Sequence, residues 1–156
     1  MSVVHLFNEL ENRVPPPLVF LATAWLMRLG GGAGVFHPGI RWLTMIVFGL
    51  PALYLAPRAI LRFRRAGTTV SPIRIGDARV LVTNGVYAYT RNPMYLSLAC
   101  LLVAWAAYLN TAWACLGPLL FIAYMTRFQI MPEERVLLSL FGEDYRRYQN
   151  RVRRWF

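Results

Sequence analysis

Apolar residues along the chain gather into four long stretches separated by polar segments. The first runs from about Pro16 into the glycine-rich residues 30–34, and the second from about Ile40 to Leu61, interrupted by two prolines. Residues 92–126 then form one uncharged stretch that is too long for one membrane crossing and suits two, since a bilayer core needs about 20 mostly apolar residues per helix. The pattern therefore predicts an all-α integral membrane protein with about four transmembrane helices.

The uncharged stretch has one polar break, at Leu109-Asn110-Thr111. We therefore predict a transmembrane helical hairpin over residues 94–131 with this tripeptide at its tip. Each arm has about 16 uncharged residues, which is short against the usual range of about 17 to 25. Either the arms extend beyond the uncharged stretch or the bilayer thins around them, and the sequence leaves both readings open.

The composition supports a membrane location. Of 156 residues, 57% are hydrophobic and 15% are charged, whereas soluble domains carry about a quarter charged residues. The chain has 17 basic residues, all arginine, against 7 acidic ones. A nucleic-acid partner would need a basic face on a water-soluble body, so we expect none.

The arginines also predict the orientation. Fourteen of them follow the second span or the end of the fourth, and basic loops stay in the cytoplasm. Both termini are therefore expected to be cytoplasmic. A compact chain rich in arginine and without lysine is typical of GC-rich bacteria, which favours the bacterial inner membrane.

We expect one membrane domain, residues 1–156, in four parts. Two N-terminal transmembrane helices occupy 1–63, a cytoplasmic loop 64–93, the hairpin 94–131, and a cytoplasmic, interfacial amphipathic helix 132–156. The loop mixes β-branched residues with turn formers and should be compact and irregular. On these residues alone it is either an interfacial loop packed on helix ends or a functional segment.

The C-terminal segment carries a pair of acids that allows two interpretations. Pro132 suits a first helical position, and Glu133 and Glu134 suit a first helical turn, where they would face the positive end of the helix dipole. Gly142 marks a break in this helix. The alternative is that the acids belong to a functional site. Arg127 either reaches toward lipid phosphates or faces the helix bundle, where Glu133 or Glu134 is a nearby partner.

Metal chemistry is not expected. His5 and His37 lie near no cysteine or carboxylate cluster, and Cys100 and Cys115 fall inside the predicted hairpin. The sequence gives no indication of the oligomeric state.

Three linked motifs in the second half carry a family resemblance. They are G-V-Y-A-Y-T-R-N-P-M-Y-L at 85–96, P-E-E-R at 132–135, and F-G-E-D-Y at 141–145 followed by Tyr148. Together they resemble the isoprenylcysteine carboxyl methyltransferase and phospholipid methyltransferase family of integral membrane enzymes. Two positions depart from the family pattern: Asn92 replaces a histidine, which excludes a titrating base there, and Ser97 replaces a glycine.

The resemblance implies methyl transfer from S-adenosylmethionine to a lipophilic or membrane-embedded acceptor that arrives from the bilayer. It places Glu133 and Glu134 on one wall of the cofactor pocket, with Tyr145 and Tyr148 as lids, and it suggests Arg127 and Glu133 for catalysis. The other wall is assigned to eight residues: Gly85, Val86, Tyr87, Arg91, Asn92, Pro93, Tyr95 and Leu96.

The chemistry of the cofactor agrees with this assignment. Glu133 or Glu134 can bind its ammonium group, and Arg91 or Arg127 its carboxylate. Because the two motifs lie at opposite ends of an antiparallel hairpin, they share a membrane face, and this convergence favours the functional interpretation of the glutamates. The acceptor stays open among a small lipophilic acid, amine, phenol or thiol and a phospholipid headgroup. The alternatives are an NADPH-dependent sterol-type membrane reductase and a non-enzymatic membrane scaffold.

Overall fold

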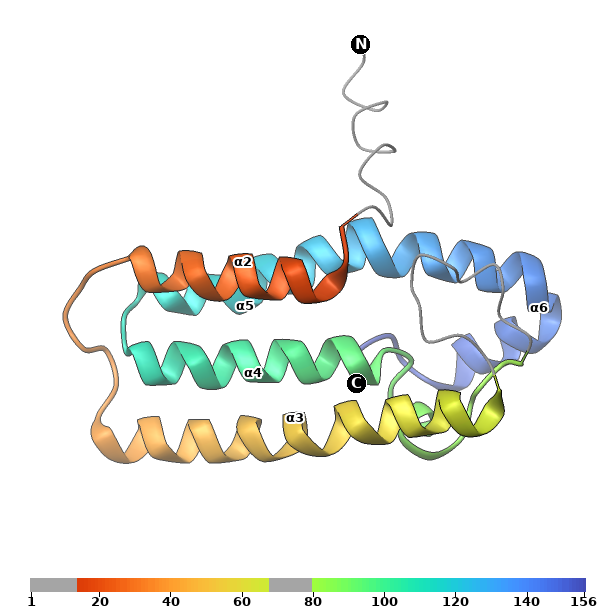
Figure 1. Ribbon diagram of the computed structural model, residues 1–156, viewed down its shortest axis with the longest axis horizontal. Coiled ribbons are helices and arrows are strands. Elements are labelled where there is room, and N and C mark those ends of the chain that lie inside the picture. The colour runs from red at the N-terminus through yellow and green to blue at the C-terminus, as the bar shows by residue number, and fades with distance from the viewer. Residues whose placement is uncertain (1–13, 68–79) are drawn as a thin grey trace, which may run out of the picture.

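The computed structural model describes residues 14–67 and 80–156, and these residues form helices and turns without a strand (Figure 1). The longer helices are α2 (Pro16–Leu29), α3 (Pro38–Ala66), α4 (Pro93–Leu109), α5 (Leu116–Tyr124) and α6 (Met131–Arg151). Two 3₁₀ turns, η2 (Gly85–Ala88) and η3 (Trp113–Cys115), and a π-helical segment, η4 (Met125–Ile130), join them. In Figure 1, α4 lies between α3 on one side and α2 with α5 on the other.

Helix α3 is longer than the sequence pattern predicts. It runs through Pro51 and Pro57 without ending, so neither proline interrupts it. The predicted boundary at residue 63 is too early, because Gly67 takes the left-handed conformation (φ 62°) that ends the helix, and its N–H bonds back to carbonyls of the last turn. Residues 68–79 of the predicted loop 64–93 lie outside the described residues.

The turn between α4 and α5 falls at Asn110, as predicted. Asn110 adopts the left-handed conformation (φ 56°), which asparagine tolerates better than most residues. Its Oδ1 accepts hydrogen bonds from the backbone N–H groups of Val35 (3.1 Å) and Phe36 (2.8 Å). The turn is thereby tied to the segment that leads into α3.

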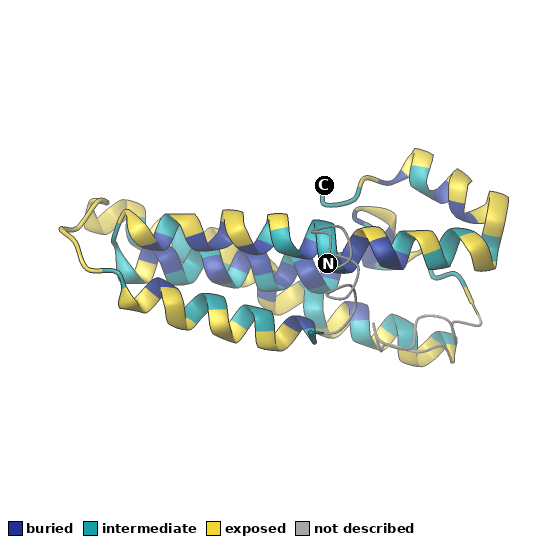
Figure 2. Ribbon diagram, turned by 90° about the horizontal axis from the view of Figure 1, so that it is seen from above, coloured by how far each residue is buried: buried dark blue, intermediate teal, exposed yellow. Residues whose placement is uncertain are grey.

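Within the described residues, two helical runs are long and apolar enough to cross a membrane: Pro38–Ala66 and Trp113–Arg151. In the second run the apolar part precedes Pro132. Helices α2 and α4 are also apolar but have only 14 and 17 residues, so they are shorter than these two runs. Leu50 and Leu53 on α3 are 62% and 70% exposed, and Figure 2 shows exposed residues along both α2 and α3. Apolar exposure on this scale marks a surface that something other than water covers.

The helices close around a small apolar core. It includes Met27 of α2, Leu102 of α4, Phe121 of α5 and Ile130 of η4, each at most 2% exposed. The Ser97 hydroxyl is buried and donates to the Ala52 carbonyl (2.9 Å), joining α4 to α3. Ser97, which replaces a glycine of the family pattern, therefore lies at a helix–helix contact.

The prediction of a helix start at Pro132 is wrong. Segment η4 continues into α6, and Ile130 and Met131 both have helical backbone angles, so no free helix N-terminus exists there. The helix-dipole interpretation of Glu133 and Glu134 therefore does not apply. Gly142 does mark a break (φ 49°, ψ −121°), and beyond it the chain turns back toward the start of α4 (Figures 1 and 2).

Candidate functional site

A polar cluster lies where α3 ends, α4 begins and α6 turns back. Its centre is Glu134, which bridges two arginines from distant parts of the sequence. Glu134 Oε1 accepts a hydrogen bond from Arg91 Nη2 (2.7 Å), and Glu134 Oε2 accepts one from Arg154 Nη2 (2.7 Å). The Glu134 and Arg91 side chains are each 11% exposed. The hydrogen bonds from the Arg154 guanidinium to Glu134 raise the pKa of Arg154.

The segment after α6 lies along the Arg91 motif and completes the cluster. The Arg91 N–H donates to the Arg153 carbonyl (3.0 Å), and Arg91 Nη1 donates to the carbonyls of Gln149 and Val152 (both 3.1 Å). Asn92 Nδ2 donates to the Arg154 carbonyl (3.0 Å). Arg91 is thus fixed by four partners and holds the returning segment in place.

Glu133 has a different environment from its neighbour. It is 8% exposed, and its Oε1 accepts hydrogen bonds from the Tyr95 hydroxyl and from Gln129 Nε2 (both 2.5 Å). Both donors are neutral, whereas Glu134 faces two cations. Burial raises the pKa of Glu133 to about 7, against the opposing effect of these two hydrogen bonds. Glu133 therefore titrates near neutral pH.

The π-helical segment positions Gln129 for this contact. Within Met125–Ile130 the chain makes wider turns than in an α-helix, and such segments are often found at functional sites. Gln129 is 3% exposed and lies four residues before Glu133, so both side chains point the same way. The π-helical segment thus places the buried Gln129 side chain beside the buried Glu133 side chain.

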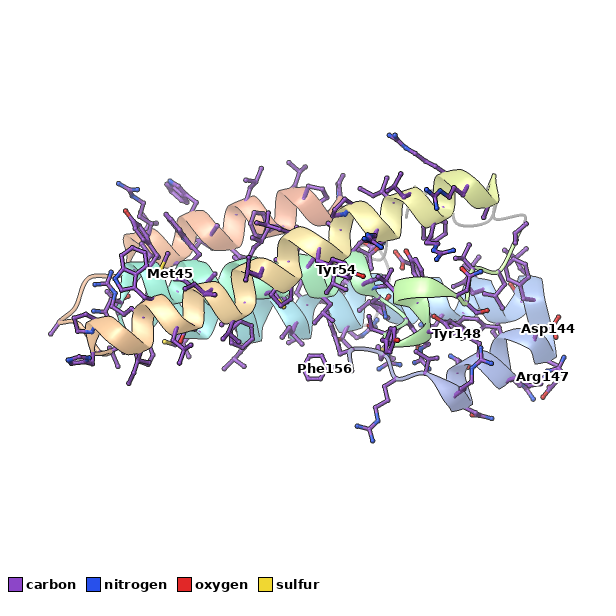
Figure 3. The ribbon with its side chains drawn as sticks, turned by 90° about the horizontal axis from the view of Figure 1, so that it is seen from below. Met45, Tyr54, Asp144, Arg147, Tyr148 and Phe156 are labelled. Carbon is purple, nitrogen blue, oxygen red and sulfur yellow. The ribbon has the colours of Figure 1, made fainter. Side chains whose placement is uncertain are left out.

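Three buried tyrosines lie next to the charged residues of the cluster. Tyr87, Tyr145 and Tyr148 are at most 5% exposed, and burial is the main cause that raises the pKa of each phenol. The Tyr148 hydroxyl donates to the Tyr87 carbonyl (2.7 Å), joining α6 to η2; Figure 3 shows Tyr148 between these elements. The predicted lids, Tyr145 and Tyr148, are instead buried side chains within the packing.

Two buried donors of the cluster have no hydrogen-bond partner within residues 14–67 and 80–156. They are the Tyr87 hydroxyl and Arg91 Nε. Buried polar groups are nearly always satisfied in native proteins. Their presence beside Glu133 and Glu134 therefore indicates a place where a ligand could accept hydrogen bonds.

The structure brings together seven of the predicted site residues: Tyr87, Arg91, Asn92, Tyr95, Glu133, Glu134 and Tyr145. The other predicted residues have local roles that the structure shows. Val86 is buried against Ala59 of α3, Pro93 begins α4, and Leu96 is half-buried in its first turn.

Arg127 lies in η4, with its guanidinium carbon 5.4 Å from the centre of the Phe128 ring. The sequence prediction offered Glu133 or Glu134 as its partner, whereas the structure pairs Glu134 with Arg91 and Arg154. The catalytic role suggested for Arg127 stays a prediction.

Sequence reasoning missed two residues of the cluster. Arg154 belongs to an arginine-rich run that indicated only membrane orientation, and nothing in its local pattern distinguishes it from Arg153. Gln129 did leave a signal, because it is an uncharged polar residue near the end of an apolar helix, where such residues usually face the protein interior.

Comparison with known proteins identifies relatives along most of the chain. An uncharacterized protein of Haemophilus influenzae is 50% identical over 62 residues, which cover 40% of this chain and 98% of that protein. Methanethiol S-methyltransferase 1 of Bradyrhizobium diazoefficiens is 41% identical over 70 residues, 43% of this chain and 22% of that protein. Protein-S-isoprenylcysteine O-methyltransferase B of Arabidopsis thaliana is 33% identical over 132 residues, 76% of this chain and 62% of that protein.

The chain thus spans less than two thirds of the length of these two named methyltransferases. No solved structure matches it. The family model for phospholipid methyltransferase matches residues 41–144, a stretch that holds the Arg91 motif, the hairpin and both glutamates. This match confirms the resemblance carried by the motifs, and the chain belongs to the phospholipid methyltransferase family.

Proposed function

We propose that this chain is an integral membrane methyltransferase that uses S-adenosylmethionine to methylate a lipophilic acceptor from the bilayer. The observation that carries the proposal is the convergence of Arg91, Glu133 and Glu134 with buried tyrosines at one end of apolar helices. Bound S-adenosylmethionine would supply a methyl group already activated on a sulfonium. The protein is then needed mainly for binding and orientation.

The residues present fit such a cofactor. Glu133 is a buried carboxylate whose partners in the described chain are neutral, so it lacks a counter-charge that a bound ammonium or sulfonium group would provide. The free donors of Tyr87 and Arg91 suit a carboxylate or a hydroxyl group. Gly85, Val86, Asn92, Pro93, Leu96 and Tyr145 remain our candidates for the rest of the cofactor wall.

The environments of the two glutamates support different roles for them. Glu134 already forms ion pairs with Arg91 and Arg154, so we assign it to holding these side chains in place. Glu133 is the candidate that contacts the cofactor. With a pKa of about 7 it could also accept a proton from an amine, thiol or hydroxyl acceptor. For a carboxylate acceptor no base is needed, and Arg127 is the candidate that orients it.

We further propose four membrane crossings with both termini in the cytoplasm of a bacterium. Successive helices run in alternating directions along one long axis (Figure 1). The end that holds the Arg91 cluster also holds the basic last turn of α3, with Arg64 and Arg65. Both features agree with a cytoplasmic location of that end.

Calorimetric titration of S-adenosylmethionine into the full chain in lipid nanodiscs tests the assignment. We expect Glu133→Gln to weaken binding more than tenfold. Glu143→Gln is the matched control, because Glu143 lies on the same helix and its side chain is 73% exposed. A cation bound beside Glu133 lowers its pKa, so at pH 7 binding should release about half a proton per cofactor, measured from the heat in buffers of different ionisation enthalpy.

Equal affinity in the wild type and both variants would contradict the role of Glu133. Binding of NADPH without binding of S-adenosylmethionine would instead favour a reductase. Transfer of labelled methyl groups into extracted host lipids and metabolites, followed by mass identification of the product, tests the activity itself. A scaffold without enzymatic activity predicts no labelled product from any extract.

A further inference from the structure

A second charged site lies outside the Arg91 cluster, at the C-terminal end of α3. A cavity of about 370 Å³ is lined there by Arg58, Leu61, Arg62 and Arg65. We propose that this cavity binds a phosphate group, carried by a membrane lipid headgroup or present as free phosphate. The proposal concerns binding alone and does not depend on methyl transfer.

The three arginines share one face of the helix without an acid to balance them. They are spaced by four and then three residues, which places them on the same side of α3, where like charges repel. None of the three forms an ion pair within the described ranges 14–67 and 80–156. Arg58 stacks over the Tyr54 ring at 4.8 Å. An anion in the cavity would remove the repulsion.

The guanidinium of Arg62 lies next to turn η2. It lies against Gly85, so closely that a Cβ atom on that residue would come 2.5 Å from Arg62 Nε. Gly85 also has a left-handed backbone (φ 64°), which favours glycine. The adjacent Phe63 packs edge-on against Tyr87, with ring centres 5.2 Å apart. Turn η2 therefore orders this end of α3, which lowers the entropic cost of binding a ligand.

A phosphate group suits the lining of this cavity. Guanidinium groups bind phosphate oxygens in pairs of hydrogen bonds, and three of them can surround one tetrahedral group. Leu61 gives the cavity an apolar wall that suits the glycerol part of a lipid. Because α3 is long and apolar enough to cross a membrane, arginines in its last turns would lie at the level of lipid phosphates.

Calorimetric titrations of the full chain in a neutral detergent would test this site. The probes are dihexanoyl phosphatidylglycerol and, separately, inorganic phosphate. We expect Arg62→Gln to weaken binding at least tenfold. Arg64→Gln removes the same charge from the same turn without altering the cavity lining, and it should change affinity less than twofold. Arg58→Gln and Arg65→Gln, at two exposed positions, repeat the test if Arg62→Gln fails to fold.

The two probes distinguish the source of the phosphate. Binding of the lipid alone supports a headgroup site, whereas inorganic phosphate that binds and displaces the lipid supports a site for free phosphate. Absence of binding by either probe overturns the proposal. An equal loss of affinity in Arg62→Gln and Arg64→Gln also overturns it, because total charge would then explain the binding.

Discussion

Replacing Glu133 by glutamine should change how the stability of the protein depends on pH. Burial raises the pKa of this carboxyl from 4.5 to about 7. Because the folded-state pKa is higher than the unfolded one, folding favours the protonated form. The contribution of Glu133 to stability is therefore full below about pH 4.5 and is lost as the pH rises through about 7. This rise in pKa corresponds to about 3 kcal/mol in the free energy of unfolding, since one pH unit is worth about 1.4 kcal/mol.

The measurement is the free energy of unfolding of the wild type and of Glu133→Gln, in mixed micelles at several values between pH 4.5 and 8. Glutamine keeps the shape and a carbonyl acceptor but does not titrate. The difference between the two proteins should therefore change by about 3 kcal/mol over this range, with the wild type losing stability relative to the variant as the pH rises.

Other titrating groups are common to both proteins and largely cancel in the difference. A difference that stays constant with pH would refute the reasoning, because it would mean that the carboxyl is equally easy to ionise in the folded and unfolded chains. A wild type that gains stability relative to the variant with rising pH would refute it more strongly. That result would require a cation or extra donors that favour the carboxylate over the acid.

Three further substitutions test contacts elsewhere. Tyr148→Phe leaves the buried Tyr87 carbonyl without its donor and should lower the free energy of unfolding by about 1–3 kcal/mol; an unchanged denaturation midpoint would contradict this. Gly117→Ala places a Cβ atom 2.3 Å from Met27 Sδ. We therefore expect the free energy of unfolding, measured by thermal unfolding, to fall by about 1–3 kcal/mol. An unchanged value would mean that α2 moves aside to make room. Asn110→Gly keeps the left-handed turn but removes the side-chain hydrogen bonds to the segment before α3. Amide hydrogen exchange at Val35 and Phe36 should accelerate. Unchanged protection would show that the Asn110 side chain does not hold this segment in place.

Those features that follow from chain direction were predictable from the sequence. Once the polar break at Asn110 defines two antiparallel helices, the Arg91 motif and the glutamate pair must lie at the same end, and their ion pair confirms this. The motif order was equally informative, because the family match covers the same region.

Features that depend on helix register and on distant contacts were not predictable. A proline followed by two acids is a typical helix start, yet here Pro132 continues a helix whose preceding turns are π-helical. Local propensity does not distinguish a first turn from an interior one when the preceding residues also favour helix. Arg154 depends on the return of the chain beyond Gly142, a long-range contact that its own sequence neighbourhood does not encode.

The π-helical segment is a place where evolution could change the register of the helix. Deleting one residue within Met125–Ile130 would allow an ordinary α-helix, and every residue before the deletion would then rotate by about 100° relative to Glu133. The lipid-facing surface of the helix and its buried carboxylate can thus be set independently of one another. Relatives that lack one residue here would present a different side of the same helix to their acceptor.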